Sequence, residues 1–153
     1  MTIWVDADAC PRLIRDILCR AAVRCSVPVC FVANQALQLP ASPFIRSYQV
    51  AKGFDVADHE IVQRCVQGDL LVSQDIPLAS DAIEKIPDLL VLTPYGEPLT
   101  AANIRHRLQM RNMMESLRND YGQHTGGKPA FSQSESKAFA DRLDRYLAGC
   151  RKA

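Results

Sequence analysis

The hydrophobic positions along the chain follow two alternating patterns. Short runs of apolar, often β-branched residues, such as Val27–Val32, are typical of buried strands. Between them lie longer segments whose apolar residues recur every three or four positions, as in an amphipathic helix. The strands predicted in this way are Thr2–Val5, Val27–Val32, Ile45–Val50, Leu70–Ser73 and Leu89–Leu92, and the helices begin at Pro11 and then span Val56–Val66, Pro77–Lys85, Ala101–Asn119 and Ser134–Ala148.

The order of these elements predicts the fold class. Strands that alternate with helices build a mostly parallel sheet with helices on both faces. We therefore predict an α/β fold, a three-layer α/β/α sandwich. A chain of 153 residues with 48% apolar and 23% charged residues suits one globular domain over residues 1–153. The glycines and Pro129 predict a flexible loop at about residues 122–133, before the C-terminal helix.

Acidic residues stand where predicted strands end. Asp6 and Asp8 follow the first strand, and Asp75 follows the fourth. The carboxyl ends of parallel strands share one edge of the sheet, where ligands gather. Two carboxylates so close together repel each other unless hydrogen-bond donors or a cation compensate. A hard divalent cation fits this pattern, either Mg²⁺ or Mn²⁺ with the same oxygen ligands.

Several of the carboxylates also have an ordinary structural interpretation. Asp55 or Asp58 can cap the helix predicted from Val56, and Asp75 can cap the helix that begins at Pro77. Asp69 follows Gly68 and suits a turn. These interpretations stay open beside the metal site.

A set of motifs resembles one known family. The stretches VDADACP, GFDVADHEI, GDLLVSQDIPLA, NIRHRLQMR and GGKPAF occur in this order over residues 3–147. Together they resemble the YaiI/YqxD family of bacterial proteins, which is grouped with PIN-like nuclease domains. The resemblance implies a PIN-like α/β/α sandwich whose acidic residues at the strand ends bind Mg²⁺ or Mn²⁺ and cut RNA.

The resemblance also implies roles for individual residues. Asp6 matches the family's metal ligand after the first strand, and Asp8 matches its usual partner. Asp58 matches the acid of an A-D-D-x-I stretch, and Asp75 matches the acid of T-x-D-I-P-L-A. These four are the candidate catalytic residues, and all of them except Asp8 are candidate metal ligands.

The chain departs from the family's motifs at two positions, and we predict supporting roles there. His59 replaces the second aspartate of A-D-D and removes one negative charge, although the adjacent Glu60 can substitute for it. Ser73 replaces a threonine and keeps a hydroxyl group that can bind a metal or orient water.

Charge is distributed unevenly along the chain. Residues 1–100 have a net charge of −4 from 8 basic and 12 acidic residues, whereas residues 101–153 have +5 from 10 and 5. This division suits a metal site beside a phosphate-binding surface. Asn103, Arg107 and Arg111 share one face of a predicted helix and Lys128 follows two glycines, so these four are candidate phosphate or nucleic-acid contacts. A solvated helix face explains the same spacing.

Other features bear on location and partners. The apolar runs are far shorter than the roughly 18 residues of a membrane span, and acidic residues arrive too early for a signal peptide, which favours a cytoplasmic protein without membrane contact. The six cysteines form no C-x-x-C pair and are expected to be reduced thiols. A homodimer stays open, because small α/β domains often associate.

From these observations we expect a metal-dependent nuclease that hydrolyses phosphodiester bonds, with RNA preferred over DNA. Two alternatives stay open. A phosphatase of the haloacid dehalogenase type also carries D-x-D after its first strand, and its nucleophile would here be Asp6. A non-catalytic nucleic-acid-binding domain with a degenerate metal site is favoured by His59 in place of aspartate.

Overall fold

A mostly parallel sheet forms the centre of the molecule. The structure, a computed structural model, describes residues 1–53, 56–121 and 133–151. Among these residues, six strands pair in the order β3-β2-β1-β4-β5-β6, and all neighbours run parallel except β5 and β6. The strands are β1 (Ile3–Asp6), β2 (Val29–Ala33), β3 (Ile45–Gln49), β4 (Leu70–Val72), β5 (Leu90–Leu92) and β6 (Pro98–Leu99).

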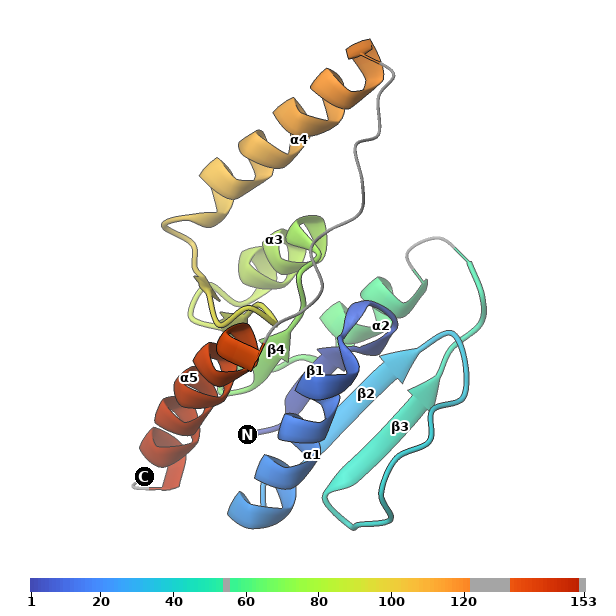
Figure 1. The fold of residues 1–153 in the computed structure, drawn as a ribbon, viewed down its shortest axis with the longest axis vertical. Coiled ribbons are helices and arrows are strands. Elements are labelled where there is room, and N and C mark those ends of the chain that lie inside the picture. Colours follow the sequence, from blue (N-terminus) through green and yellow to red (C-terminus); the bar gives the residue numbers. More distant parts are fainter. Residues whose placement is uncertain (54–55, 122–132, 152–153) are drawn as a thin grey trace.

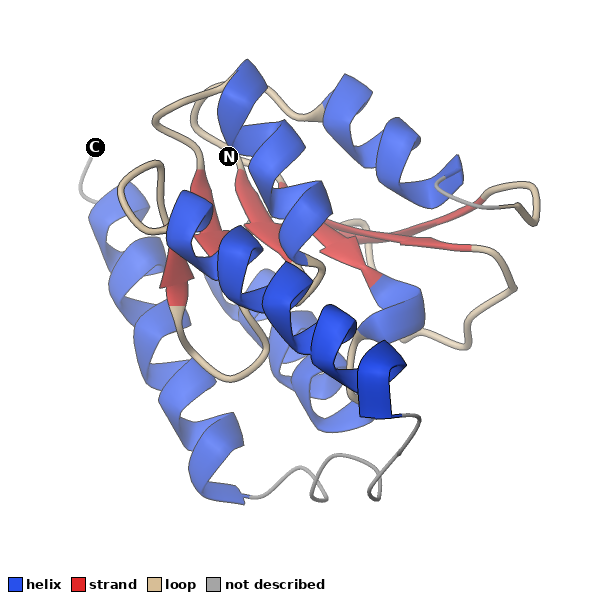
Figure 2. Ribbon diagram, turned by 90° about the horizontal axis from the view of Figure 1, so that it is seen from above, coloured by secondary structure: helices blue, strands red, loops and turns tan. Residues whose placement is uncertain are grey.

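Helices cover both faces of this sheet, as Figures 1 and 2 show. On one face, α1 (Arg12–Cys25) packs with α5 (Gln133–Arg151), and on the other lie α2 (Val56–Arg64) and α3 (Ile76–Lys85). The 18-residue α4 (Ile104–Tyr121) packs on α3 and extends beyond it. The predicted three-layer α/β/α architecture is confirmed.

The two apolar layers follow from the hydrophobic pattern. Ile14 and Leu18 of α1 are fully buried against Phe31 of β2, and α5 adds Phe139 and Leu143 at a spacing of four residues. Burying one such side chain contributes about 1.5–3 kcal/mol relative to leaving it exposed. The second layer joins the opposite side of the sheet to apolar residues of α2 and α3 and to the start of α4.

The predicted boundaries differ from the structure in a few places. The helix expected from Ala101 starts at Ile104, because the Asn103 side chain accepts a hydrogen bond from the Thr100 N–H at 2.9 Å and closes a turn there. The two-residue strand β6 is too short to give a periodic signal and was not predicted. The loop predicted at 122–133 lies outside the described residues except for Gln133, at which α5 begins.

The strand order creates a place for a site. Strand β1 lies between β2 and β4. From β1 the chain continues to β2 and β3 on one side of the sheet, and then returns to β4 and β5 on the other side of β1. Ligands of open α/β sheets bind at the carboxyl ends of the strands that flank such a switch point. None of the described helices is both long enough and apolar enough to cross a bilayer.

Candidate metal centre

Three carboxylates from separate segments meet at this edge of the sheet. Asp6 is the last residue of β1, Asp75 directly precedes α3, and Asp58 lies in the first turn of α2. One carboxylate oxygen from each residue lies within 4.8 Å of the corresponding oxygens of the other two. The two strand-end residues predicted from the hydrophobic pattern, and the helix residue implied by the family resemblance, therefore form one group, the carboxylate triad.

Asp6 is the most buried member of the triad, with 7% of its surface exposed. Its carboxylate accepts a hydrogen bond from the Ser73 hydroxyl at 3.2 Å. Burial raises the pKa of Asp6 from 3.8 to about 6; the Ser73 hydrogen bond lowers it, and the charges of Asp75 and Asp8 raise it further. Desolvation and like charge thus both disfavour the carboxylate form of Asp6.

Asp75 is held in position by hydrogen bonds of both its backbone and its side chain. Its backbone N–H donates to the Ser73 hydroxyl oxygen at 3.0 Å, and its Oδ1 accepts from the Leu78 N–H at 3.1 Å. The second contact is an N-cap of α3, whose first turn contains Pro77. The predicted capping role is therefore present together with membership of the triad, and Ser73 links Asp75 to Asp6.

This set of side chains fits a hard divalent cation. All three contribute carboxylate oxygens, the ligands that Mg²⁺ and Mn²⁺ prefer. Among the ion pairs of the described residues, none involves Asp6 or Asp75. A bound divalent cation would offset both the burial of Asp6 and the mutual repulsion of the triad.

Comparison with known proteins assigns the chain to a family. Residues 4–149 match the family described as Uncharacterized BCR, YaiI/YqxD family. The chain belongs to the YaiI/YqxD family. It is 57% identical over 147 residues to a UPF0178 protein of Marinobacter nauticus, covering 96% of each chain. It is 53% identical over 146 residues to the UPF0178 protein YaiI of Escherichia coli, covering 95% of this chain and 94% of the other.

A further relative, a UPF0178 protein of Bordetella petrii, is 54% identical over 153 residues, the full length of both chains. No solved structure matches the chain. The names of these relatives state a family and no activity.

Asp8 lies beside the triad rather than in it. It belongs to the short 3-10 helix η1 (Ala7–Ala9), its side chain is exposed, and its Oδ2 accepts a hydrogen bond from the Asn34 N–H at 2.9 Å. Asp8 therefore links the end of β1 to the end of β2. Its negative charge still acts on Asp6.

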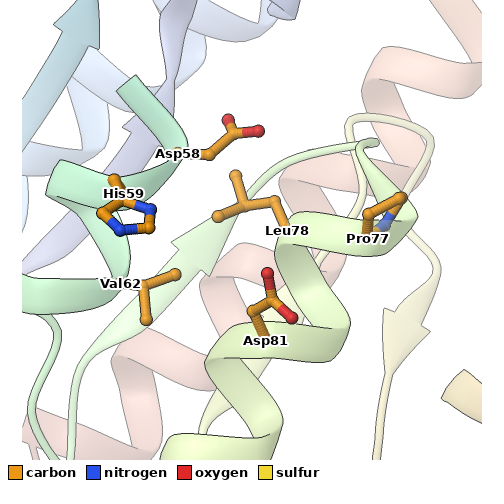
Figure 3. Close-up of a pocket in the computed structure, with 6 residues that line it drawn as sticks. All are labelled: Asp58, His59, Val62, Pro77, Leu78 and Asp81. Carbon is orange, nitrogen blue, oxygen red and sulfur yellow. The ribbon is translucent and has the colours of Figure 1, made fainter. Parts of the chain in front are cut away.

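Glu60 and His59, the two predicted supporting residues of α2, have different surroundings. Glu60 forms an ion pair with Arg64, one helical turn further along α2. His59 is exposed and lines a pocket of about 350 Å³ next to Asp58 (Figure 3). Asp81 of α3, an acidic residue to which the sequence assigned no site role, lines the same pocket.

Of the candidate phosphate contacts, Arg107 and Arg111 lie on α4 and Asn103 directly precedes it. Asn103 donates from its side chain to the Pro98 carbonyl at 3.1 Å, and Arg107 forms an ion pair with Glu97. Arg111 is exposed. Lys128 lies outside the described residues. Asn103 and Arg107 therefore also hold the segment that connects β5 to α4.

Cys10 follows the acidic motif but is poorly suited to nucleophilic chemistry. Burial raises the pKa of its thiol to about 12, and Arg15 lowers it by less. A thiol with this pKa is protonated at neutral pH, so it supplies almost no thiolate nucleophile.

Proposed function

We propose that this chain is a metal-dependent nuclease that hydrolyses phosphodiester bonds, with RNA as the expected substrate. The observation that carries the proposal is the convergence of Asp6, Asp58 and Asp75 to within 4.8 Å at the carboxyl edge of the sheet. Acidic groups gathered in this way hold the cation on which nucleases of this chemistry depend.

Each member of the site has a task in this proposal. The triad would hold Mg²⁺ or Mn²⁺, which supplies an activated water and stabilises the leaving oxygen during phosphodiester hydrolysis. Ser73 orients Asp6 through its hydroxyl and fixes the Asp75 backbone. Asp8 adds negative charge next to Asp6 and supports binding of the cation.

The basic residues after position 100 support nucleic acid as the substrate. This part of the chain carries a net charge of +5, and Arg107 and Arg111 lie on α4, which packs on α3, the helix that Asp75 caps. Guanidinium groups bind phosphate oxygens of any sequence. An incoming phosphate competes with Glu97 for Arg107, because those two side chains form an ion pair. The buried free thiols of Cys19, Cys30 and Cys65 suit a reducing compartment, so we propose a cytoplasmic location.

A cleavage assay on mixed RNAs with added Mg²⁺ or Mn²⁺ tests the proposal. We expect Asp6→Asn and Asp75→Asn to reduce cleavage by about a hundredfold or more, because each removes a charged ligand. Asparagine is also a good N-cap, so Asp75→Asn keeps the start of α3 intact. Asp88→Asn is the matched control, since Asp88 is exposed and precedes β5 at the opposite edge of the sheet. Full activity of both site variants would contradict the proposal.

Metal binding can be measured without any substrate. At ten times its dissociation constant, Mn²⁺ should raise the free energy of unfolding of the wild type by about 1.4 kcal/mol. Asp6→Asn should lose this stabilisation, and Asp88→Asn should keep it.

The two alternatives give distinct results in the same experiments. RNA binding that survives EDTA and Asp6→Asn, with no cleavage under any divalent ion, would favour the non-catalytic binding domain. Phosphate release from small esters together with a phosphorylated Asp6 would favour the phosphatase.

A further inference from the structure

A pocket of about 350 Å³ opens between α2 and α3, next to the carboxylate triad. Asp58 belongs to both the triad and the pocket wall, so the two sites are contiguous. Helical spacing builds the two walls, because residues three and four positions apart share one face. One wall is formed by α2 and the other by α3, and Figure 3 shows Leu78 between the Asp58 and Asp81 side chains. The lining residues are Asp58, His59 and Val62 of α2 and Pro77, Leu78 and Asp81 of α3.

The lining combines an apolar floor with polar groups at the rim. Val62, Pro77 and Leu78 supply the apolar surface, and Leu78 has only 1% of its surface exposed. None of the six lining residues is lysine or arginine and two are aspartates, so this lining is a poor match for an anionic phosphate. The carboxylate of Asp81 can only accept hydrogen bonds. The lining therefore suits a flat, largely apolar group with hydrogen-bond donors on its edge.

We propose that this pocket is a nucleobase subsite that selects guanine, and this inference rests on the proposed nuclease function. Guanine presents two adjacent donors, N1–H and N2–H, which match the two oxygens of the Asp81 carboxylate. Its ring would pack on the apolar floor, and the exposed imidazole of His59 offers a stacking surface. Because the pocket adjoins the triad, the selected base would belong to a nucleotide next to the phosphate that is cut.

The other three bases fit this wall less well. Adenine and cytosine each pair one amino donor with a ring nitrogen acceptor, which faces a carboxylate oxygen unfavourably. Uracil has one donor between two carbonyl acceptors. A carboxylate at this position therefore repels the acceptor that each of the other bases places beside its donor, whereas the O6 acceptor of guanine lies outside its N1–H and N2–H pair.

The test measures binding of the four nucleosides to the full chain in EDTA by NMR chemical-shift perturbation. We expect guanosine to bind at least about tenfold more tightly than adenosine, cytidine or uridine. Asp81→Asn should weaken guanosine binding about tenfold, and Val62→Phe should abolish it by filling the pocket. Asp88→Asn is again the matched control and should bind guanosine normally.

Further arms separate this inference from the proposed function. Asp6→Asn should retain guanosine binding while losing cleavage, because Asp6 does not line the pocket. Guanosine binding by a protein that never cuts RNA would refute the nuclease and leave the subsite standing. Equal binding of all four nucleosides, an unchanged affinity in Asp81→Asn, or equal binding of argininamide, which has paired donors but no purine ring, would each overturn the subsite.

Discussion

Two buried aspartates, one at each edge of the sheet, differ in how their charge is compensated. Asp69 directly precedes β4 at the amino edge and is 5% exposed, and Asp6 ends β1 at the carboxyl edge and is 7% exposed. The Asp69 carboxylate accepts hydrogen bonds from Thr2 N–H at 2.9 Å, from the Trp4 indole N–H at 2.9 Å and from Val66 N–H at 3.1 Å. Asp6 accepts one from Ser73 and lies against two other carboxylates.

The difference distinguishes a carboxylate whose charge is compensated by hydrogen bonds within the protein from one whose charge is not. Three N–H donors compensate the buried charge of Asp69, and in return Asp69 ties β1 to the turn before β4. Among the described contacts Asp6 has one donor, and like charges lie beside it, so its ionised form lowers stability unless a cation offsets that charge. A buried aspartate that lacks enough donors is therefore the better marker of function.

The largest effect is expected from removing the structural carboxylate. Asp69→Ala leaves three donors, two backbone and one indole, without an acceptor in a buried place. The free energy of unfolding should fall by roughly 3–5 kcal/mol, as for other buried polar networks that lose one partner. Urea unfolding followed by circular dichroism measures this loss. The exposed Asp88→Ala serves as control, and a loss below about 1 kcal/mol in Asp69→Ala would remove the contrast with Asp6.

Replacing Asp6 is expected to raise, rather than lower, the free energy of unfolding when no metal is present. The folded-state pKa of about 6 lies above the ordinary value of 3.8, so the folded protein holds a proton more tightly than the unfolded chain does. Stability therefore rises as the pH falls from above 6 toward 4, and the penalty at neutral pH amounts to about 3 kcal/mol at most. Asp6→Asn should remove this penalty and be more stable than the wild type in EDTA near neutral pH.

Urea titrations at about pH 5 and about pH 7.5 measure this effect. The gain in stability on going to the lower pH should be smaller in Asp6→Asn than in the wild type. Equal pH dependence in the two proteins would mean that Asp6 is not the group responsible. Repeating the titration with Mn²⁺ at about 500 times its dissociation constant, which adds about 3.7 kcal/mol to the wild type, should reverse the order of the two stabilities near neutral pH.

Much of the fold and part of the site could be predicted from residue patterns. Buried strands read as apolar runs, and alternation with helices leads to a parallel sheet whose carboxyl edge gathers Asp6 and Asp75. Asp58 came from the family resemblance, because a carboxylate in the first turn of a helix is indistinguishable from a cap by spacing alone. The convergence of all three depends on the strand order, which the pattern does not specify.

Other features required three-dimensional packing. Asp69 suited a turn from its place after Gly68, and only the structure shows that the Trp4 indole reaches it across 65 positions of sequence. The pocket beside Asp58 is formed by α2 and α3 together, so the sequence of either helix alone does not predict it. Arg107 lies on the predicted helical face, yet its pairing with Glu97 could not be read from spacing.

The smallest effect is expected at Ser73, the only residue that donates a hydrogen bond to Asp6 among the described contacts. Ser73→Ala removes that bond and the acceptor for the Asp75 N–H, which should lower the free energy of unfolding by about 1–2 kcal/mol near neutral pH. Because the hydroxyl lowers the pKa of Asp6, its loss should raise that pKa above about 6, and NMR titration of the carboxyl group measures this change. Ser73→Thr keeps the hydroxyl and should behave like the wild type. If Ser73→Ala left the pKa of Asp6 unchanged, the hydroxyl would only position Asp75, and the charge of Asp6 would depend on burial and its acidic neighbours alone.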